Sequence, residues 1–339
     1  MIQSKNDACL FTNKDLVIIV YVDDLIVIAK DDEKMEQVKI GLEKDMIIKN
    51  LGKVEKYCSI VIEEKDGKLL LNQTEMIENL ALKFGLSGCA QKDMIPFQEF
   101  IDYENENIDF SYPIRSLIGS LSFISNRTRP DVSVIVNYLA RFQSKPSKIL
   151  WEDTKRVLKY LYLTKDEKLI VGDLVNNEEK EKNKVIVFSD ASQPLSGYDG
   201  NAITGILIKV FESTIFWSSN KQKWIATSTA ESELYAMSLG IDESLSIKRT
   251  CEELFNETFK IKIMTDNKTA LEAFKNRPKK KLRKVDLRFI HVMDCLNKQV
   301  IDCCYIPGSA QIADYLTKPL KIKTSENVLK LLLGYDGDC

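Results

Sequence analysis

The sequence contains a single histidine, His291, among its 339 residues. One histidine excludes a metal site built from several histidines and disfavours Ser-His-Asp and Cys-His mechanisms. The eight cysteines include no Cys-x-x-Cys pair, although Cys303 and Cys304 are adjacent. This spacing is not that of a zinc site or a disulfide framework, so we expect reduced thiols. Any catalysis should therefore depend on carboxylates.

Two further absences narrow the class of protein. No apolar run approaches the length of a membrane span, and no basic-then-apolar signal peptide opens the sequence. We therefore expect no membrane partner. The net charge is only −2, so attraction to nucleic acid would have to come from a local basic stretch. Hydrophobic residues at 44% and charged residues at 29% are typical of a globular chain with room for two or three domains.

The first 80 residues read mainly as strands. Two apolar runs, Val17–Tyr21 and Leu25–Ala29, flank the pair Asp23-Asp24 and predict a hairpin. A helical stretch over 32–44 and two strands around the turn at 65–68 follow.

Residues 81–175 read as helical. One predicted helix places these apolar residues on one face: Ile114, Leu117, Ile118, Leu121 and Ile124. Pro130 suits the first turn of a second helix. A third, "WEDTKRVLKYLYL", turns Val157, Leu158 and Leu161 inward. The charged tract 176–184 predicts a linker to the next domain.

The order of elements changes in residues 185–320. Strands are expected at 185–189, 203–210 and 214–218, then a long helix at 229–255 and a strand at 260–267. Helices at 268–275 and 285–296, a strand at 300–307 and a closing helix in 309–320 complete the domain. This order predicts a mixed-sheet α/β domain, so that the whole chain is α/β (α+β), with a C-terminal tail at 321–339.

Four acids occupy positions next to apolar residues, where an ionised side chain would be unfavourable in a protein core. Asp190 and Asp266 directly follow apolar strands, and Asp314 lies among apolar neighbours. Any one of these aspartates alone could equally be a helix cap. Glu233 flanks the buried stripe that we expect along the long helix, whereas Glu231 should face solvent. That stripe is formed by Ala230, Leu234, Met237, Ile241 and Leu245. A glutamate beside such a stripe is costly unless it is paired or binds a metal.

Four carboxylates at one sheet edge would repel one another. Mg²⁺ or Mn²⁺ suits a site built only from carboxylates. Two such ions can activate a water and stabilise the leaving oxygen of a phosphodiester, which requires no histidine.

The last domain resembles the RNase H domain of Ty1/copia-type retrotransposon Pol polyproteins. The matching stretches are "FSDAS", "TGILI", "FWSSNKQKWIATSTAESELYA", "MTDNKTAL" and "IADYLTKPL". The resemblance implies that the metal-binding and catalytic acids are Asp190, Glu233, Asp266 and Asp314. It also implies two Mg²⁺ (or Mn²⁺) ions and, as substrate, the RNA strand of an RNA/DNA hybrid. The sequence departs from the family at Ser192, which replaces a usual second acid, and at "RKVD" before the last helix. His291 is displaced by one from the family's histidine, and we expect it to have no role.

The N-terminal part resembles the same family, since "YVDDLIVIAK" is similar to the polymerase motif of reverse transcriptases. Further stretches, among them "LLLNQTEMIENLALKFGL" and "YPIRSLIGSLSFISNRTRPDVSVIVNYLARFQSKP", extend the match to about residues 17–320. The resemblance implies the C-terminal part of a truncated palm at 1–80 and a thumb or connection at 81–175. It also makes the missing polymerase part, or other proteins of the element, candidate partners.

Nucleotidyl transfer by two metals needs a carboxylate beyond Asp23 and Asp24. Asp15 is on the same strand, roughly 26 Å away at ~3.3 Å per residue. Asp7 is on a short tail with no strand pattern to hold it. We therefore interpret Asp23 and Asp24 as a remnant of the polymerase motif and expect no autonomous DNA synthesis.

A basic stretch, "KNRPKKKLRK", precedes the penultimate predicted helix. Its basic residues are Lys275, Arg277, Lys279, Lys280, Lys281, Arg283 and Lys284. It can be a solvated loop or a nuclear-import-like signal, but beside Asp266 we favour contacts with the phosphates of a duplex.

Two other functions stay open. The chain could be a catalytically inactive retroelement remnant that at most binds nucleic acid, or an integrase- or resolvase-type nuclease on the same fold. The second explains neither the thumb-like middle nor the terminal "ADYLTKPL". The family resemblance implies an intracellular protein of cytoplasmic element particles, with the nucleus as a further location.

Overall fold

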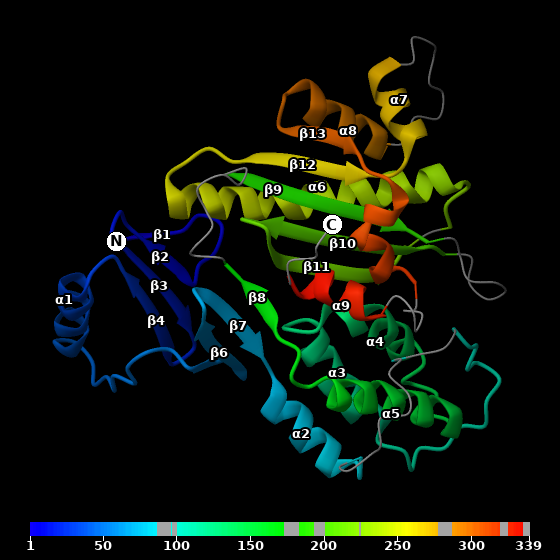
Figure 1. The fold of residues 1–339 in the computed structure, drawn as a ribbon, viewed down its shortest axis with the longest axis horizontal. Coiled ribbons are helices and arrows are strands. Elements are labelled where there is room, and N and C mark those ends of the chain that lie inside the picture. The colour runs from blue at the N-terminus through cyan, green and yellow to red at the C-terminus, as the bar shows by residue number, and fades with distance from the viewer. Residues whose placement is uncertain are drawn as a thin grey trace.

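The structure is a computed structural model that describes residues 1–86, 96, 100–172, 183–192, 201–223, 225–276, 287–318 and 325–334. The chain begins with a four-stranded antiparallel sheet at one end of the molecule (Figure 1). Its strands, in spatial order, are β1 (Ile2–Gln3), β2 (Leu10–Thr12), β3 (Leu16–Tyr21) and β4 (Asp24–Ala29). Helix α1 (Asp32–Glu43) follows. The predicted hairpin of β3 and β4 is confirmed, and β1 and β2 are strands that the sequence pattern did not reveal.

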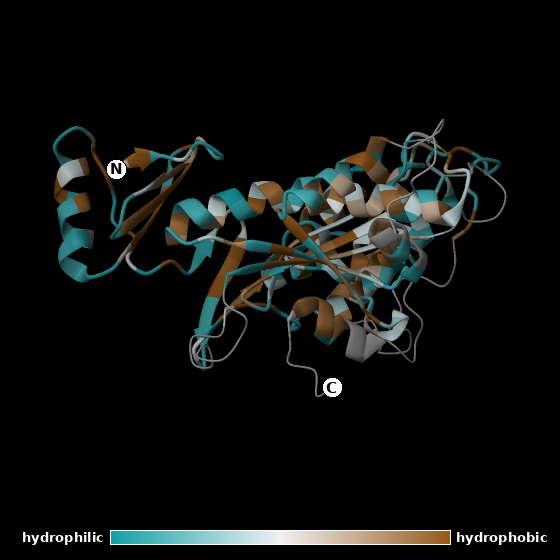
Figure 2. Ribbon diagram, turned by 90° about the horizontal axis from the view of Figure 1, so that it is seen from above, coloured by the Kyte–Doolittle hydropathy of each residue, from teal (hydrophilic) through white to brown (hydrophobic). Residues whose placement is uncertain are grey.

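This first sheet buries little of its apolar surface. Both faces of the β3–β4 pair are apolar, since Ile18 lies opposite Val27 and Ile19 opposite Ile26. Helix α1 contains no buried residue. Figure 2 shows the apolar strands of this sheet at the far end of the molecule from the last sheet. Helix α1, which packs against β4, and the ring of Tyr57, which contacts Tyr21 of β3, leave much of the sheet that carries Asp23 and Asp24 uncovered.

A second antiparallel sheet joins the two halves of the molecule. It comprises β5 (Lys56–Tyr57), β6 (Ile60–Lys65), β7 (Lys68–Asn72) and β8 (Leu169–Val171). The predicted turn between β6 and β7 has positive φ at Asp66 and Gly67, as a tight hairpin requires. Strand β8 follows the helical segment and pairs with β7. Just beyond β8, the backbone N–H of Gly172 donates to Ser213 Oγ of the last sheet at 2.7 Å.

The middle of the chain is helical, as predicted. Its elements are α2 (Thr74–Lys83), α3 (Ile114–Ser125), η1 (Pro130–Val132), α4 (Ser133–Ala140) and α5 (Lys148–Leu163). The predicted apolar faces of α3 and α5 are buried in one core with α4, and Pro130 opens a 3₁₀ turn. A fully buried ion pair between Arg129 and Asp131, 2.8 Å long, is completed by hydrogen bonds from Arg129 to Thr164. This network holds the start of α4 to the end of α5.

The last sheet has five strands in the order β11-β10-β9-β12-β13. They are β9 (Lys184–Ala191), β10 (Ile203–Val210), β11 (Ser213–Lys221), β12 (Lys260–Thr265) and β13 (Ile301–Tyr305). The first three pair antiparallel, whereas β12 is parallel to both β9 and β13. The helices are α6 (Thr229–Phe255), α7 (Lys268–Asn276) and α8 (Leu287–Asn297). The mixed α/β sheet predicted from the sequence is confirmed.

Both faces of this sheet are covered. Ile206 and Ile208 of β10 pack with α6, whereas Leu207 between them packs with η3 (Ile312–Leu316) and α9 (Ser325–Leu333) on the opposite face. Edge strand β11 joins the helical core, because Trp217 Nε1 donates to the Ser125 carbonyl at 2.8 Å and Asn137 Nδ2 to the Ser219 carbonyl at 2.8 Å.

Several details differ from the sequence predictions. The expected closing helix is two short 3₁₀ segments, η2 (Gly308–Ala310) and η3, and the segment expected as a C-terminal tail contains α9. In the stripe of α6, Met237 and Ile241 are buried and Leu234 and Leu245 partly so, but Ala230 in the first turn is exposed. Glu231, expected in solvent, is half-buried, and its carboxylate accepts from the backbone N–H and the hydroxyl of Thr227 at 2.6 Å each.

The cysteines within the described ranges are free thiols, as predicted: Cys9, Cys58, Cys251, Cys295, Cys303 and Cys304. None of the helices that the structure describes is both long and apolar enough to pass through a membrane.

Candidate active site

Asp190 and Asp266 lie on neighbouring parallel strands. In the register of β9 and β12, Phe188 is beside Met264, and continuing by two residues sets Asp190 beside Asp266. Because the strands are parallel, both acids are at the same, carboxyl-terminal edge of the sheet. This is the edge at which α/β proteins commonly bind ligands, and it is where the sequence predicted both side chains.

Glu233 reaches this edge from the first turns of α6. Ser228 caps the helix, with its hydroxyl accepting from the Glu231 N–H at 3.2 Å. The buried Gln222 at the end of β11 then fixes the first turn, since its Nε2 lies 3.0 Å from both the Ser232 carbonyl and Thr204 Oγ1. The helix start is therefore bound to β10 and β11 one residue before Glu233.

Asp314 is carried by η3, which packs directly against the backbone of β10. A Cβ placed on Gly205 would lie 2.6 Å from the Ala313 carbonyl oxygen, 2.8 Å from a Thr317 methyl and 2.9 Å from Leu316 Cβ. Gly205 is the strand partner of Asp190. The absence of a side chain at Gly205 is thus what lets η3 approach the strand that bears Asp190.

Gln311 ties the three acid-bearing segments together. Its side chain is buried, and its Nε2 donates to the Ser189 carbonyl of β9 at 3.1 Å and lies 3.4 Å from the Met264 carbonyl of β12. Its Oε1 accepts from the Ala313 N–H of η3 at 3.4 Å. One amide side chain therefore sets the spacing between the segments that carry Asp190, Asp266 and Asp314.

Asp190 is the most enclosed of the four acids, at 5% exposure. Burial raises the pKa of its carboxyl to about 6, and the charges of Asp314 and Asp266 act in the same direction. A hydrogen bond opposes this rise, since Thr317 Oγ1 donates to Asp190 Oδ2 at 2.7 Å. Thr317 itself is completely buried.

Glu233 shows the same conflict more strongly. Burial and then the charges of Asp190 and Asp266 raise the pKa of its carboxyl to about 9, against a hydrogen bond from the Ala191 backbone and the charge of Lys318. Each of the four predicted acids therefore interacts electrostatically with at least one other. The structure brings Asp190, Glu233, Asp266 and Asp314 to one edge of the sheet, where their mutual repulsion is only partly balanced.

Part of the ligand capacity of these acids is already used by the protein. Thr317 binds Asp190, and the ammonium of Lys318 forms an ion pair with Asp314 Oδ1. Within the ranges that the structure describes, no three His, Cys, Asp or Glu side chains are arranged so that they could hold a metal ion as they stand. The donor chemistry fits Mg²⁺ or Mn²⁺, because the site offers only carboxylate oxygens and an excess of buried negative charge.

The structure shows the positions of Ser192 and His291, two residues at which the sequence departs from the family pattern. Ser192 is buried at the end of β9, where its hydroxyl accepts from the Ile203 N–H at 3.3 Å. His291 lies on α8 with its Nε2 3.5 Å from Asp242 Oδ1. Asp242 is nine residues after Glu233 in α6, about 13 Å along the helix axis. His291 thus faces a different part of α6 from the acids.

Asp23 and Asp24 are exposed at the tip of the β3–β4 hairpin. Val22 in this turn has φ of 54°, an unfavourable value for a β-branched residue, and its side chain is 82% exposed. Asp15 lies at the opposite end of the hairpin, where its carbonyl accepts from the Lys30 N–H.

The sequence predicted that Asp7 lies on a tail with no strand to hold it. The structure instead places Asp7 in the turn between β1 and β2. Its carboxylate accepts from the Cys9 N–H at 2.8 Å and so stabilises that turn. The short strands on either side escaped detection because two or three residues are too few to show an alternating pattern.

The basic stretch cannot be placed against the acids. Arg277, Lys279, Lys280, Lys281, Arg283 and Lys284 lie outside the described residues, and of Lys275 only the backbone in α7 is described.

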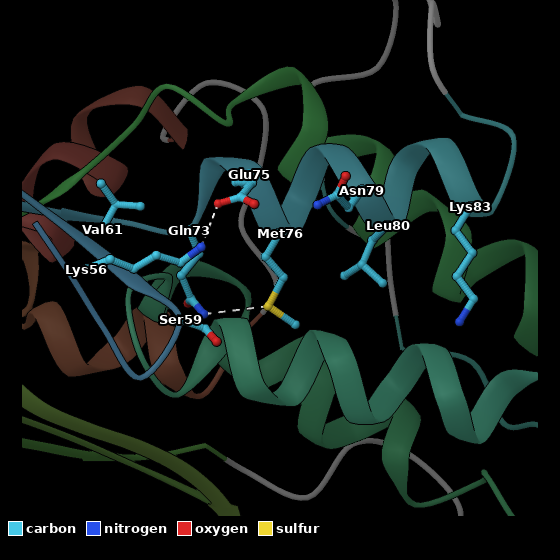
Figure 3. A pocket seen from close by; sticks show the side chains of 9 residues that line it. All are labelled: Lys56, Ser59, Val61, Gln73, Glu75, Met76, Asn79, Leu80 and Lys83. Carbon is cyan, nitrogen blue, oxygen red and sulfur yellow. Dashed lines mark hydrogen bonds and ion pairs between the residues drawn. The ribbon is translucent and has the colours of Figure 1, made fainter. Parts of the chain in front are cut away.

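A hollow of about 300 Å³ lies away from the acids, between β5–β6 and α2 (Figure 3). Lys56 and Glu75 on its wall form an ion pair of 2.7 Å, and Gln73 contacts the sulfur of Met76. Its lining contains only one acid, Glu75, so it has no cluster of carboxylates comparable to the one at the sheet edge.

Sequence reasoning identified the four acids but missed the residues that hold them: Gly205, Gln222, Gln311, Thr317 and Lys318. A signal existed for two of these, because Thr317 and Lys318 follow Asp314 by three and four residues and therefore share its side of a helical turn.

A mixed five-stranded sheet with a long helix across it and acids from four segments at one edge defines an RNase H-like α/β domain. Comparison with solved structures finds likenesses to RNase H domains over about 40% of the chain. The N-terminal RNase H domain of a Mycobacterium tuberculosis protein matches 40% of this chain and 91% of its own length, with 17% identity and a TM-score of 0.31. An RNase H1 isolated from compost, in a complex described as containing an RNA/DNA hybrid, matches 38% and 88%, with 15% identity and a TM-score of 0.30. These likenesses concern the fold alone and carry no functional conclusion.

Sequence comparison covers nearly the whole chain. The family model described as "Reverse transcriptase (RNA-dependent DNA polymerase)" matches residues 5–99. The retrovirus-related Pol polyprotein from transposon TNT 1-94 of Nicotiana tabacum is 26% identical over 94% of this chain and 24% of its own length. The Ty1-ER2 Gag-Pol polyprotein of Saccharomyces cerevisiae is 26% identical over 94% of this chain and 19% of its own length.

By these comparisons the chain is similar, over nearly all of its length, to the Pol polyproteins of Ty1/copia-type retrotransposons, and its N-terminal part matches a reverse-transcriptase family model. The chain spans about a quarter or less of the length of these curated relatives.

Proposed function

We propose that the C-terminal domain is a metal-dependent endoribonuclease of the RNase H type, which hydrolyses the RNA strand of RNA/DNA hybrids. One observation carries this proposal. Four acids from β9, α6, the end of β12 and η3 meet at one sheet edge, where burial and mutual repulsion raise the pKa of Asp190 and Glu233. Such a concentration of buried negative charge is unfavourable unless a cation is to be bound there.

The four acids have distinct parts in this proposal. Asp190 and Asp266, on adjacent strands, would anchor the metal pair, with Glu233 holding one ion and Asp314 the other. Two bound Mg²⁺ or Mn²⁺ ions would supply the activation of water and the stabilisation of the leaving oxygen. The chain itself fixes the carboxylates, through Thr317 on Asp190 and Gln311 across the three segments, and so orders the site before substrate arrives.

Substrate choice would rest on the shape of the hybrid and its 2′-hydroxyl groups and not on base sequence. The basic stretch at 275–284 would contribute contacts with phosphates. Changing Lys279, Lys280 and Lys281 to Ala should reduce the slope of hybrid affinity against salt concentration, measured by fluorescence anisotropy. An unchanged slope would reject these contacts.

The direct test is cleavage of a hybrid with a labelled RNA strand, in Mg²⁺, by the full chain. The parent should cleave, and Asp190→Asn should lower the rate by at least 100-fold, on the order of the losses seen when a main electrostatic group of an active site is removed. Asp302→Asn, an exposed acid on β13 outside the group, is the matched control and should cleave like the parent. Lack of cleavage by a folded parent would refute the proposal.

A second candidate is a catalytically inactive remnant that at most binds nucleic acid. The observation in its favour is that no metal-holding arrangement of side chains exists in the described residues, since Thr317 and Lys318 already bind two of the acids. Hybrid binding without cleavage, unaffected by Asp190→Asn, would support this candidate.

We propose no DNA synthesis by this chain alone. Asp23 and Asp24 are exposed, and Asp7 and Asp15 in the same sheet are engaged in the β1–β2 turn or lie at the far end of the hairpin. A partner that brings a further carboxylate, such as the remaining polymerase part of a Pol polyprotein, would be required. Primer extension that depends on Asp23 in the purified chain would contradict this.

A further inference from the structure

Lys318 is a positive charge placed among the four acids. It follows η3, four residues after Asp314, and its ammonium forms an ion pair with Asp314 Oδ1. The same ammonium interacts electrostatically with Asp190 and Glu233. One lysine therefore faces three of the four carboxylates, and its charge cancels part of their repulsion in the protein without metal.

We propose that Lys318 is a tethered counter-ion of this acid group, which competes with divalent metal ions for Asp314 and so lowers their affinity. This inference rests on the function proposed above and adds to it a residue that regulates metal loading.

The contacts of Asp314 indicate that Lys318 and a metal ion would compete for its carboxylate. A Mg²⁺ ion takes carboxylate oxygens at about 2.0–2.1 Å in a nearly ideal octahedron. An ammonium hydrogen-bonded to Oδ1 of the same carboxylate occupies one of its two oxygens and places a like charge next to the ion. Binding of a metal at Asp314 thus requires that Lys318 move away or that the two cations repel each other.

The burial of the pair allows such a movement. The Lys318 side chain is 56% exposed and that of Asp314 37% exposed. The flexible four-carbon stem of a lysine lets its ammonium turn into solvent at small cost. Thr317, by contrast, is completely buried and cannot release Asp190 in this way. The two residues after η3 therefore differ, with Thr317 fixing one acid and Lys318 shielding another.

The chain provides a matched control for this pair. Lys298, just after the end of α8, and Asp294 on α8 form an ion pair with the same four-residue spacing, which is 2.6 Å long and also exposed. They precede β13 and therefore lie at the opposite edge of the sheet from the acids. Removal of Lys298 reports what the loss of an exposed lysine does in general.

The test is calorimetric titration of the full chain with Mn²⁺ alone, without nucleic acid. Lys318→Met should bind Mn²⁺ roughly two- to fivefold more tightly than the parent, which corresponds to removal of one partly exposed charge interaction. Lys318→Arg, which keeps the charge, and Lys298→Met should bind no more tightly than the parent. In EDTA, Lys318→Met should melt roughly 1–2 °C below Lys298→Met, since the acids lose their counter-ion.

The outcomes separate this inference from the proposed function. If the parent binds Mn²⁺ and Lys318→Met binds it equally or more weakly, this inference is overturned but the proposed function is not. Weaker binding would make Lys318 a residue that positions Asp314 for the metal. If the parent and Asp190→Asn give the same Mn²⁺ isotherm, the proposed metal site fails. The melting comparison in EDTA then still decides whether Lys318 acts as a counter-ion.

Discussion

The first and last sheets both end apolar strands with aspartates, but they place those aspartates in opposite surroundings. Asp23 and Asp24 stand on an exposed hairpin tip of a sheet with few buried residues. Asp190 stands at the edge of a sheet covered on both faces, against Thr317, and near acids from three other segments. The same residue type after the same kind of strand is therefore a solvated turn in one sheet and a strongly perturbed carboxyl in the other.

This difference shows that the chemistry of an acid depends on what is packed around it. The tip acids can be hydrated at no cost, so nothing in their surroundings calls for a cation. Asp190 and Glu233 are enclosed near η3 and α6, which limits their contact with water and brings their charges close to those of the other two acids. The layer that covers the sheet, more than the strand that bears the acid, thus creates the candidate site.

Gly205→Val should have the largest effect, because it attacks that covering layer. Its Cβ would meet the Ala313 carbonyl oxygen at 2.6 Å, so η3 must move away from β10. We expect the free energy of unfolding to fall by about 2–3 kcal/mol, at the upper end for overpacking, as measured by urea denaturation. Affinity for Mn²⁺ should fall with it, since Asp314 and Thr317 move together.

Gly119→Ala is the control for this substitution. Gly119 lies inside α3, and a Cβ there would meet nothing within 4 Å, so the variant should be as stable as the parent or more stable. If Gly205→Val were as stable as Gly119→Ala, close packing of η3 on β10 would not be what forms the edge.

The pH dependence of stability should also distinguish the two sheets. Burial and the charges of Asp190 and Asp266 raise the pKa of Glu233 from 4.5 to about 9. A carboxyl whose pKa is raised by folding binds its proton more tightly in the folded state. It therefore stabilises the protein fully below pH 4.5, and this contribution is lost as the pH rises towards 9.

In EDTA, the melting temperature of the parent should therefore fall by several degrees between pH 5 and pH 9, followed by circular dichroism. Glu233→Gln should remove much of this fall, whereas Glu243→Gln, an exposed position of the same helix, should keep it. Saturating Mg²⁺ should also reduce the fall, because a bound cation favours the ionised carboxyl. A flat profile for the parent would mean that the edge acids are as well solvated as those of the hairpin tip.

Much of the last sheet could be predicted because its elements are long. The helix from Thr229 to Phe255 was predicted at about these bounds, and Asp190 and Asp266 follow apolar strands whose ends were clear. The strands β1 and β2 have two and three residues, so no periodicity could reveal them. The roles of Gly205 and Gln311 were invisible for a different reason. They arise from contacts between segments about 100 residues apart, which no local pattern encodes.

Thr317→Val should have a moderate effect that tests how Asp190 is held. The variant keeps the shape of the side chain but removes the 2.7 Å hydrogen bond to Asp190 Oδ2. We expect a loss of about 1 kcal/mol in the free energy of unfolding, and a further rise in the pKa of Asp190, because its charged form loses a donor. Urea denaturation measures the free energy of unfolding and infrared titration of the carboxyl measures its pKa, with Thr317→Ser as the rescue variant and Thr250→Val on the surface of α6 as the control. A pKa that stays unchanged would show that the hydroxyl serves only the Asp314 carbonyl, which lies 2.9 Å away.

Asp23→Asn and Asp24→Asn should have the smallest effects. Both side chains are exposed at a turn and make no hydrogen bond in the structure that fixes the hairpin, so the free energy of unfolding should change by less than about 0.5 kcal/mol. Hybrid cleavage and Mn²⁺ affinity should also equal those of the parent, since the tip belongs to the first sheet and the edge acids to the last. A marked loss of stability or of cleavage in either variant would show that the two sheets act as one functional unit, and the contrast between a solvated tip and an enclosed edge would no longer hold.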